Sequence, residues 1–238
     1  MIRILHLYYD IMNLYGDNGN VRFLEKALKD QKQEVEITRK TLTDTLDDLD
    51  QYDIIYCGSS TERRRTACLK HLLPYKDLLK KAYENDSVFL FTGNSYEMMG
   101  KSIETPEGTL EGIGLFDFKT VEQAETRYTS DVIVTCEEIK EKSVGFINKC
   151  SKVIDNDHPL FRIVGKVGNT NSEQDGIHLR NFFGTQLIGP LLIKNPYFAR
   201  YFIKTVFRLK GIPVYKDIEY PHMLKAYNTT MTELSKDI

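Results

Sequence analysis

Strand-length runs alternate with longer helical segments along the first hundred residues, and this alternation constrains the fold more than any other feature. The strand-like runs are Ile2–Tyr9, Glu34–Thr38, Asp53–Cys57 and Val88–Phe91. Between them lie segments with the apolar spacing or the length of helices, namely Val21–Lys32, Glu62–His71 and Tyr75–Asn85. Strand–helix alternation predicts an α/β fold, with a mostly parallel central sheet and helices on both faces.

The pattern changes in the second half of the chain. The runs Phe116–Lys119, Asp131–Thr135 and Lys142–Asn148 predict shorter strands with antiparallel pairing. The apolar stripe of Pro196–Lys210 predicts a last long helix. A polar segment follows Pro213, and it suits either an appended helix or a partly disordered tail. We therefore expect one domain over residues 1–212 and a C-terminal tail over residues 213–238.

Charge and cysteine usage exclude several classes of protein. Lys and Arg number 32 against 34 Asp and Glu, which gives a net charge of −2 and no reason to expect nucleic acid or an anionic membrane as partner. No window is apolar enough to span a bilayer, and the N-terminus lacks the features of a signal peptide. The cysteines are far apart and the histidines show no ligand spacing, so we expect reduced thiols, no metal site and a cytoplasmic location.

Residues Val88–Met99 have the layout of a nucleophile elbow. A buried strand leads through a sharp turn into a helix, which exposes one side chain at the sheet edge beside backbone N–H groups. Ser95 is a candidate nucleophile, because Gly93–Glu97 nearly fits G-x-S-x-G; the alternative is that Asn94 or Ser95 only caps the helix. Cys57 ends a strand at the same edge, where it is either a reactive thiol or a small buried residue.

Several segments, taken together and in order, resemble one family. They are Asn13–Asn20, Gly93–Lys101, Thr105–Phe118, Val144–Asn148 and Gly176–Pro190. They are similar to class I glutamine amidotransferases of the cobyric acid synthase (CobB/CobQ) type, and within these to the glutaminase subunits of bacterial lipid II isoglutaminyl synthases. The resemblance covers roughly residues 1–215 and implies the flavodoxin-like three-layer sandwich of that family.

The resemblance also assigns roles to positions. In the family a cysteine thiolate attacks the glutamine amide, a histidine activates it, and a glycine-rich loop holds the oxyanion. Carried over, the nucleophile falls on Gly93, the histidine on Ile188 and the oxyanion loop on Gly58-Ser59-Ser60. Lys149-Cys150-Ser151 replaces a histidine followed by glycines. Arg127 matches an arginine that helps to hold the glutamine substrate.

The resemblance and these losses imply a catalytically degenerate amidotransferase-like subunit without a cofactor. It would form a heterodimer with a Mur-ligase-like protein in the amidation of the peptidoglycan precursor lipid II. One alternative is a hydrolase that uses a displaced nucleophile, Ser95 or Cys57. Another is a regulatory protein that binds glutamine or a related amino acid through Arg127, Gly58, Ser59 and Asn94.

Overall fold

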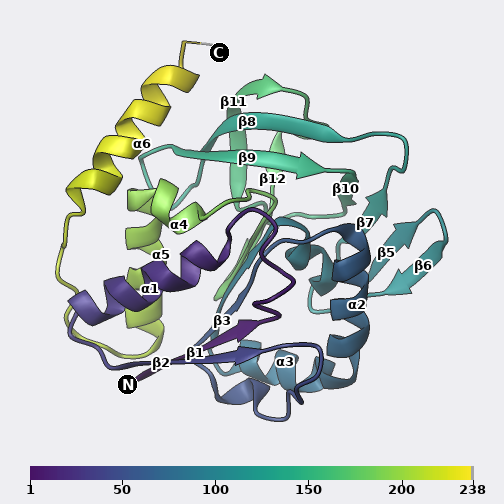
Figure 1. Ribbon diagram of the computed structural model, residues 1–238, viewed down its shortest axis with the longest axis horizontal. Helices are drawn as coiled ribbons and strands as arrows, with labels where there is room; N and C mark the ends of the chain where they lie inside the picture. The colour runs from purple at the N-terminus through teal and green to yellow at the C-terminus, as the bar shows by residue number, and fades with distance from the viewer. Residues whose placement is uncertain (237–238) are drawn as a thin grey trace.

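Six strands form the central sheet of the computed structural model, which describes residues 1–236 (Figure 1). Their order is β13-β14-β4-β3-β1-β2, and every neighbouring pair is parallel except β13 with β14. The bounds are β1 Ile2–Leu7, β2 Val35–Lys40, β3 Ile54–Cys57, β4 Val88–Thr92, β13 Ile177–Leu179 and β14 Phe182–Thr185. The predicted parallel sheet is confirmed.

Helices cover both faces of this sheet because successive side chains of a strand point to opposite faces. Ile54, Val88 and Leu90 belong to one buried cluster, which includes residues of α1 and α5. Ile55 and Phe89 belong to a second cluster, which includes residues of α2 and α3. The bounds are α1 Asn18–Asp30, α2 Glu62–Leu72, α3 Lys76–Glu84, α4 Leu191–Lys194, α5 Pro196–Leu209 and α6 Pro221–Leu234, with 3₁₀ turns η1 Leu49–Gln51, η2 Leu73–Tyr75 and η3 Gly93–Met99.

Two four-stranded sheets lie beyond the carboxyl ends of the central strands. One has the order β10-β7-β5-β6 and the other β12-β11-β8-β9. Their pairs are antiparallel except β5 with β7. The bounds are β5 Ser102–Thr105, β6 Gly108–Glu111, β7 Lys119–Glu122, β8 Tyr128–Thr135, β9 Ser143–Lys149, β10 Ser151–Ile154, β11 Phe161–Gly168 and β12 Gln174–Asp175. The antiparallel character expected for this region is therefore confirmed.

The helix expected after β4 is present as the 3₁₀ helix η3, most of whose residues are buried. One local expectation was wrong. The strand expected at Phe116–Lys119 begins only at Lys119. Phe116 and Phe118 are buried core residues whose rings pack on Tyr83 and Tyr96 respectively, so this apolar run fills the core instead of pairing in a sheet.

The C-terminal segment forms α6, which lies along the outside of α4 and α5 (Figure 1). Tyr227 is its one buried residue; its hydroxyl donates to the carbonyl of Lys142 at 2.6 Å, and its ring packs edge-on against Tyr197.

The division of the chain at residue 212 stays a prediction, and residues 237–238 lie outside the described part. Within residues 1–236 no helix is long and apolar enough to cross a membrane.

Asn195 connects the helical layer to β9. Its Oδ1 accepts from the N–H of Val144 at 2.7 Å, and its Nδ2 donates to the carbonyls of Val144 and Leu191 at 2.9 and 3.0 Å. Since Asn195 is buried, its amide takes the place of a neighbouring strand for this part of β9.

We expect Asn195→Ala to lower the free energy of unfolding by about 2–4 kcal/mol, because it leaves buried backbone groups of Val144 without partners. Urea denaturation measures the change. Asn228→Ala on the exposed face of α6 is the matched control, and we expect it to cost less than about 0.5 kcal/mol. Equal losses in the two variants would contradict the role given to Asn195.

Candidate functional site

A cavity of about 120 Å³ lies at the carboxyl ends of β3 and β4, where an α/β sheet places its ligands. We call it the elbow cavity. Its walls come from the loop after β1, the start of α2, the turn after β4, the end of β9 and the loop after β14. The lining residues are Leu14, Tyr15, Ser59–Glu62, Arg65, Gly93, Asn94, Glu97, Arg127, Asn148–Ser151 and Ile188.

Gly93 has the backbone of a nucleophile elbow but no room for a side chain. Its φ of +62° is in the left-handed region, which L side chains adopt at a cost. A Cβ at this position would lie 2.3 Å from the Cβ of Ser59 and 2.9 Å from Cγ2 of Ile188. The fold thus brings together Gly93, Ile188 and the Gly58-Ser59-Ser60 loop. Ser59 and Ile188 fill the space beside the elbow.

Two backbone donors of the Gly58-Ser59-Ser60 loop, those of Ser59 and Ser60, are already bonded within the protein. The N–H of Ser59 donates to Oδ2 of Asp17 at 2.9 Å, and the N–H of Ser60 donates to Oδ1 of Asn94 at 3.1 Å. Gly58 is required by close packing, since a Cβ there would lie 2.2 Å from the carbonyl oxygen of Met12. Neither of these two N–H groups is therefore free to donate a hydrogen bond to an oxyanion.

Asp17 holds this arrangement from the loop after β1. It is fully buried, and its carboxylate also accepts the hydroxyl of Ser59. Burial raises the pKa of Asp17, while the two donors of Ser59 and the charge of Lys194 oppose that rise. The side chain of Ser59 is thus turned toward Asp17, so its hydroxyl is engaged rather than poised for chemistry.

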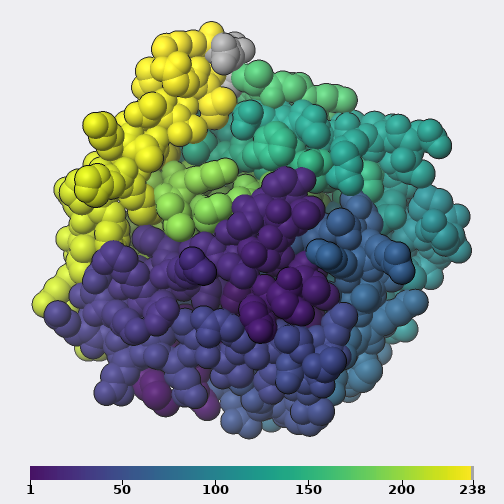
Figure 2. Space-filling view, viewed as in Figure 1, coloured from purple at the N-terminus to yellow at the C-terminus, as the bar shows by residue number. Residues whose placement is uncertain are grey.

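Arg127 lies at the mouth of the elbow cavity with its guanidinium occupied. Its Nη2 donates to Oε1 of Glu62 and its Nη1 to Oδ1 of Asn148, both at 2.8 Å. Asn148 in turn donates to the hydroxyl of Tyr15 at 2.6 Å. Figure 2 shows, on the outer surface, the N-terminal segment in purple against atoms of the middle of the chain in teal. A carboxylate ligand at Arg127 would share the guanidinium with Glu62, which takes one of its five N–H donors.

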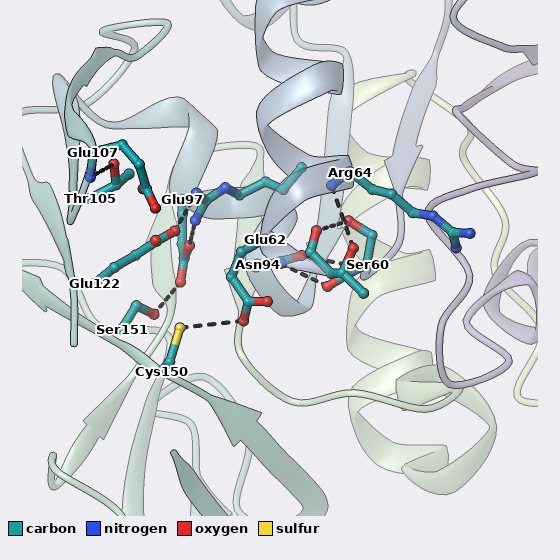
Figure 3. A network of polar contacts seen from close by, with 12 residues as sticks. Ser60, Glu62, Arg64, Asn94, Glu97, Thr105, Glu107, Glu122, Cys150 and Ser151 are labelled. Carbon is teal, nitrogen blue, oxygen red and sulfur yellow. Dashed lines mark hydrogen bonds and ion pairs between the residues drawn. The ribbon is translucent and has the colours of Figure 1, made fainter. Parts of the chain in front are cut away.

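A buried ion pair closes the floor of the elbow cavity. Arg65 is 1% exposed and donates to Glu97 at 2.6 Å and to Glu122 at 2.5 Å. Glu97 also accepts from Ser151 and, at 2.6 Å, from Gln186. Figure 3 shows Ser151 directed toward Glu97, with Glu122 beside them. Burial is the largest single influence on the pKa of Arg65 and lowers it, but the two nearby carboxylates together raise that pKa above its usual value.

Sequence reasoning did not find this ion pair, although a signal for it exists. Arg65 occupies the buried stripe of α2 together with Cys68, Leu69 and Leu72, at helical spacing. A charged residue on an apolar stripe indicates a buried partner. In the sequence, its partner Glu97 stands out only as a glutamate at the last position of G-x-S-x-G, where the pattern has glycine.

Neither candidate for a displaced nucleophile lines the elbow cavity. Ser95 is fully buried, and its hydroxyl donates to the carbonyls of Thr92 and Cys57 at 2.8 and 3.1 Å. Cys57 is fully buried, and burial raises the pKa of its thiol well above the usual range. Both environments favour an unreactive side chain.

Cys150 is the thiol that does line the elbow cavity. Its Sγ lies 3.3 Å from Oε1 of Glu62, toward which it points in Figure 3. Burial and the adjacent Glu62 carboxylate raise the pKa of Cys150 to about 12. The residues nearby thus suppress its thiolate. Among residues 1–236 no group of three or more His, Cys, Asp or Glu side chains is arranged to hold a metal ion.

Comparison with known proteins identifies the relatives of this chain. Residues 3–196 match the CobB/CobQ-like glutamine amidotransferase domain. The chain is 32% identical over 214 residues to the lipid II isoglutaminyl synthase (glutamine-hydrolyzing) subunit GatD of Staphylococcus aureus. The aligned region covers 89% of this chain and 87% of the relative. It is 28% identical over 238 residues to the Streptococcus pneumoniae subunit of the same name, and that alignment covers 95% of this chain and 90% of the relative.

A solved structure supports the fold. The crystal structure of a Thermoplasma acidophilum protein, named for a GMP synthase component, superposes with a TM-score of 0.53 at 12% identity. The match covers 89% of this chain and 97% of that chain. At this level of identity the likeness concerns the fold alone.

The contact between Gly93 and Ser59 can be tested through stability. We expect Gly93→Ala to lower the free energy of unfolding by about 1–3 kcal/mol more than Gly114→Ala, because its Cβ is overpacked. Gly114 is the matched control: its φ is +65°, but a Cβ added there would meet nothing within 4 Å, so it reports the cost of the backbone alone.

Adding Ser59→Gly to Gly93→Ala should recover most of this additional loss in the free energy of unfolding, since it removes the Cβ of Ser59, the atom nearest to the new methyl group. Thermal and urea unfolding of the wild-type chain, Gly93→Ala, Ser59→Gly and the double variant measure the coupling. A Gly93→Ala variant no less stable than Gly114→Ala would show that the elbow has room for a side chain.

Proposed function

The chain belongs to the CobB/CobQ-like glutamine amidotransferase family, and on that premise we propose that it is a catalytically degenerate subunit that does not hydrolyse glutamine. The observation that carries this proposal is the filled elbow. Gly93 stands at the position matched to the nucleophile, and Ser59 and Ile188 occupy the space that a nucleophile's side chain would need. Without a nucleophile, no covalent intermediate can form.

Two further observations support the loss of activity. The N–H donors of Ser59 and Ser60 are bonded to Asp17 and Asn94, so stabilisation of an oxyanion by this loop would require both bonds to break. Removing even one oxyanion donor typically lowers kcat by about 10²–10³-fold. The alternative of a displaced nucleophile finds little support, because Ser95 and Cys57 are buried away from the elbow cavity.

The expected setting is the amidation of a peptidoglycan precursor. Both GatD relatives are subunits of lipid II isoglutaminyl synthase, and the similarity extends over most of this chain and most of each relative. We propose that this chain is likewise a subunit of such a complex, with a Mur-ligase-like protein as its partner in a heterodimer. Its role there would be structural or regulatory, and the ammonia would come from another source.

An amidation assay tests this proposal. With a Mur-ligase-like partner, ATP and lipid II, we expect product when an ammonium salt is the nitrogen source and none when glutamine is. Glutamate release from glutamine should equal the buffer blank, with or without the partner. The Staphylococcus aureus relative, which is named as glutamine-hydrolyzing, serves as the positive control.

Glutamate release above the blank would refute the proposal. If that release disappeared in Ser95→Ala or Cys57→Ala, the displaced-nucleophile alternative would take its place. Failure to co-purify with any Mur-ligase-like protein would count against the partner, but not against the loss of hydrolysis.

The amino-acid-sensor alternative is tested at Arg127. Because Glu62 already engages Arg127, we expect the wild-type chain to give no calorimetric heat with glutamine. Glu62→Gln removes the competing carboxylate and should allow weak binding, which a second change, Arg127→Gln, should abolish. The Glu62–Arg127 pair is partly exposed, so Glu62→Gln should change the free energy of unfolding by no more than about 1 kcal/mol. Wild-type binding of glutamine would instead establish the sensor.

A further inference from the structure

A second cavity, of about 280 Å³, lies on the other side of the β9–β10 connection from the elbow. We call it the lysine cavity, because Lys149 and Lys152 line it together with Asn156, Ser172, Gln174 and Asp175. Lys149 lines both cavities and stands in the wall between them. The volume is just below the roughly 300–1,000 Å³ of typical ligand pockets, which limits an occupant to a small molecule.

Lys149 is a buried cation without a protein acceptor. It is only 7% exposed, and no residue of the described chain accepts a hydrogen bond from its ammonium or lies within ion-pair distance. An ammonium has three N–H donors. The Nζ of Lys149 is not among the fully buried polar atoms without a partner, so it reaches solvent-accessible space, where water or a ligand can supply acceptors.

The neighbouring carboxylates do not supply those acceptors. Glu97 and Asp175 are the charges that act on Lys149. Glu97 is bonded to Arg65, Ser151 and Gln186. Asp175 accepts from the hydroxyl of Thr185 and, at 3.1 Å, from the N–H of Gln186. Both carboxylates are therefore engaged by other donors.

The rest of the cavity favours an anion as the occupant. Lys152, on the exposed face of β10, has no partner within the described residues and adds a second positive charge at the rim. The exposed Asp155 places a negative charge at the same rim, and water screens both of these charges alike. Burial raises the pKa of Asp175, while the hydroxyl of Thr185 and the charge of Lys149 oppose that rise. Burial also lowers the pKa of Lys149, and an anion beside the ammonium would reverse that effect.

We propose that the lysine cavity is a second ligand site, for a small organic carboxylate whose oxygens accept from the ammonium groups of Lys149 and Lys152. The amides of Asn156 and Gln174 and the hydroxyl of Ser172 lie on the same walls and suit the polar remainder of such an acid. This site is separate from the filled elbow and does not depend on whether glutamine hydrolysis is lost.

Calorimetric titration with sodium glutarate tests the proposal, with sodium chloride at equal ionic strength as the blank. We expect saturable binding to the wild-type chain, weakened at least 10-fold in Lys149→Gln and by a smaller factor in Lys152→Gln. Lys166→Gln, an exposed lysine on β11, is the matched control and should leave the affinity unchanged. Circular dichroism establishes that each variant is folded.

Lys152→Gln keeps the test decisive if Lys149→Gln does not fold, because Lys152 is exposed and its replacement disturbs no core. Absence of saturable binding, or binding equally strong in the lysine variants, would overturn the proposal. Binding that is lost in Arg127→Gln but kept in Lys149→Gln would place the carboxylate in the elbow cavity and also overturn it. None of these outcomes bears on the glutaminase assay.

Discussion

The guanidinium of Arg65 is the point on which the walls of the elbow cavity depend. It reaches from α2 to Glu97 in η3 and to Glu122 in β7, and Glu97 carries the connection on to Ser151 and Gln186. Five separate segments thus meet at one buried charge. Removing one partner of such a pair typically costs about 3–5 kcal/mol, because the other charge is left uncompensated. The cavity therefore keeps a defined shape without any substrate to organise it.

The backbone after β4 has the geometry of a catalytic elbow, and the proposed loss of activity concerns only the side chains around it. Gly93 keeps a positive φ at the end of β4, and Ile188 is held beside it by a backbone hydrogen bond to Phe146. A side chain at either position would still point at the other. What differs is chemical: neither residue can carry a proton or form a covalent bond. The backbone geometry of the elbow depends on the sheet, whereas its chemistry depends on single side chains, so one can be kept without the other.

The sequence predicted those parts of the protein that depend on local periodicity. The alternation of Ile2–Tyr9, Val21–Lys32 and the following runs led to the central sheet, and the resemblance led to the family. It did not predict that Glu62 would occupy Arg127, because an ion pair between residues 65 apart leaves no local pattern. The capped donors of Ser59 and Ser60 were equally hidden, since their partners Asp17 and Asn94 come from other strand ends.

The proposed loss of glutamine hydrolysis would give the features around the elbow a common physical cause. A working site keeps unmatched donors, a strained backbone and open space, and each of these features costs stability. Once a nucleophile is lost, nothing maintains that cost, and substitutions that fill or pair the site are favoured. Ser59 and Ile188 fill the space, Asp17 and Asn94 take the donors, and Glu62 neutralises Arg127. On the proposed function, a cysteine introduced at position 93 would therefore meet Ser59 and Ile188 in the space that its side chain needs.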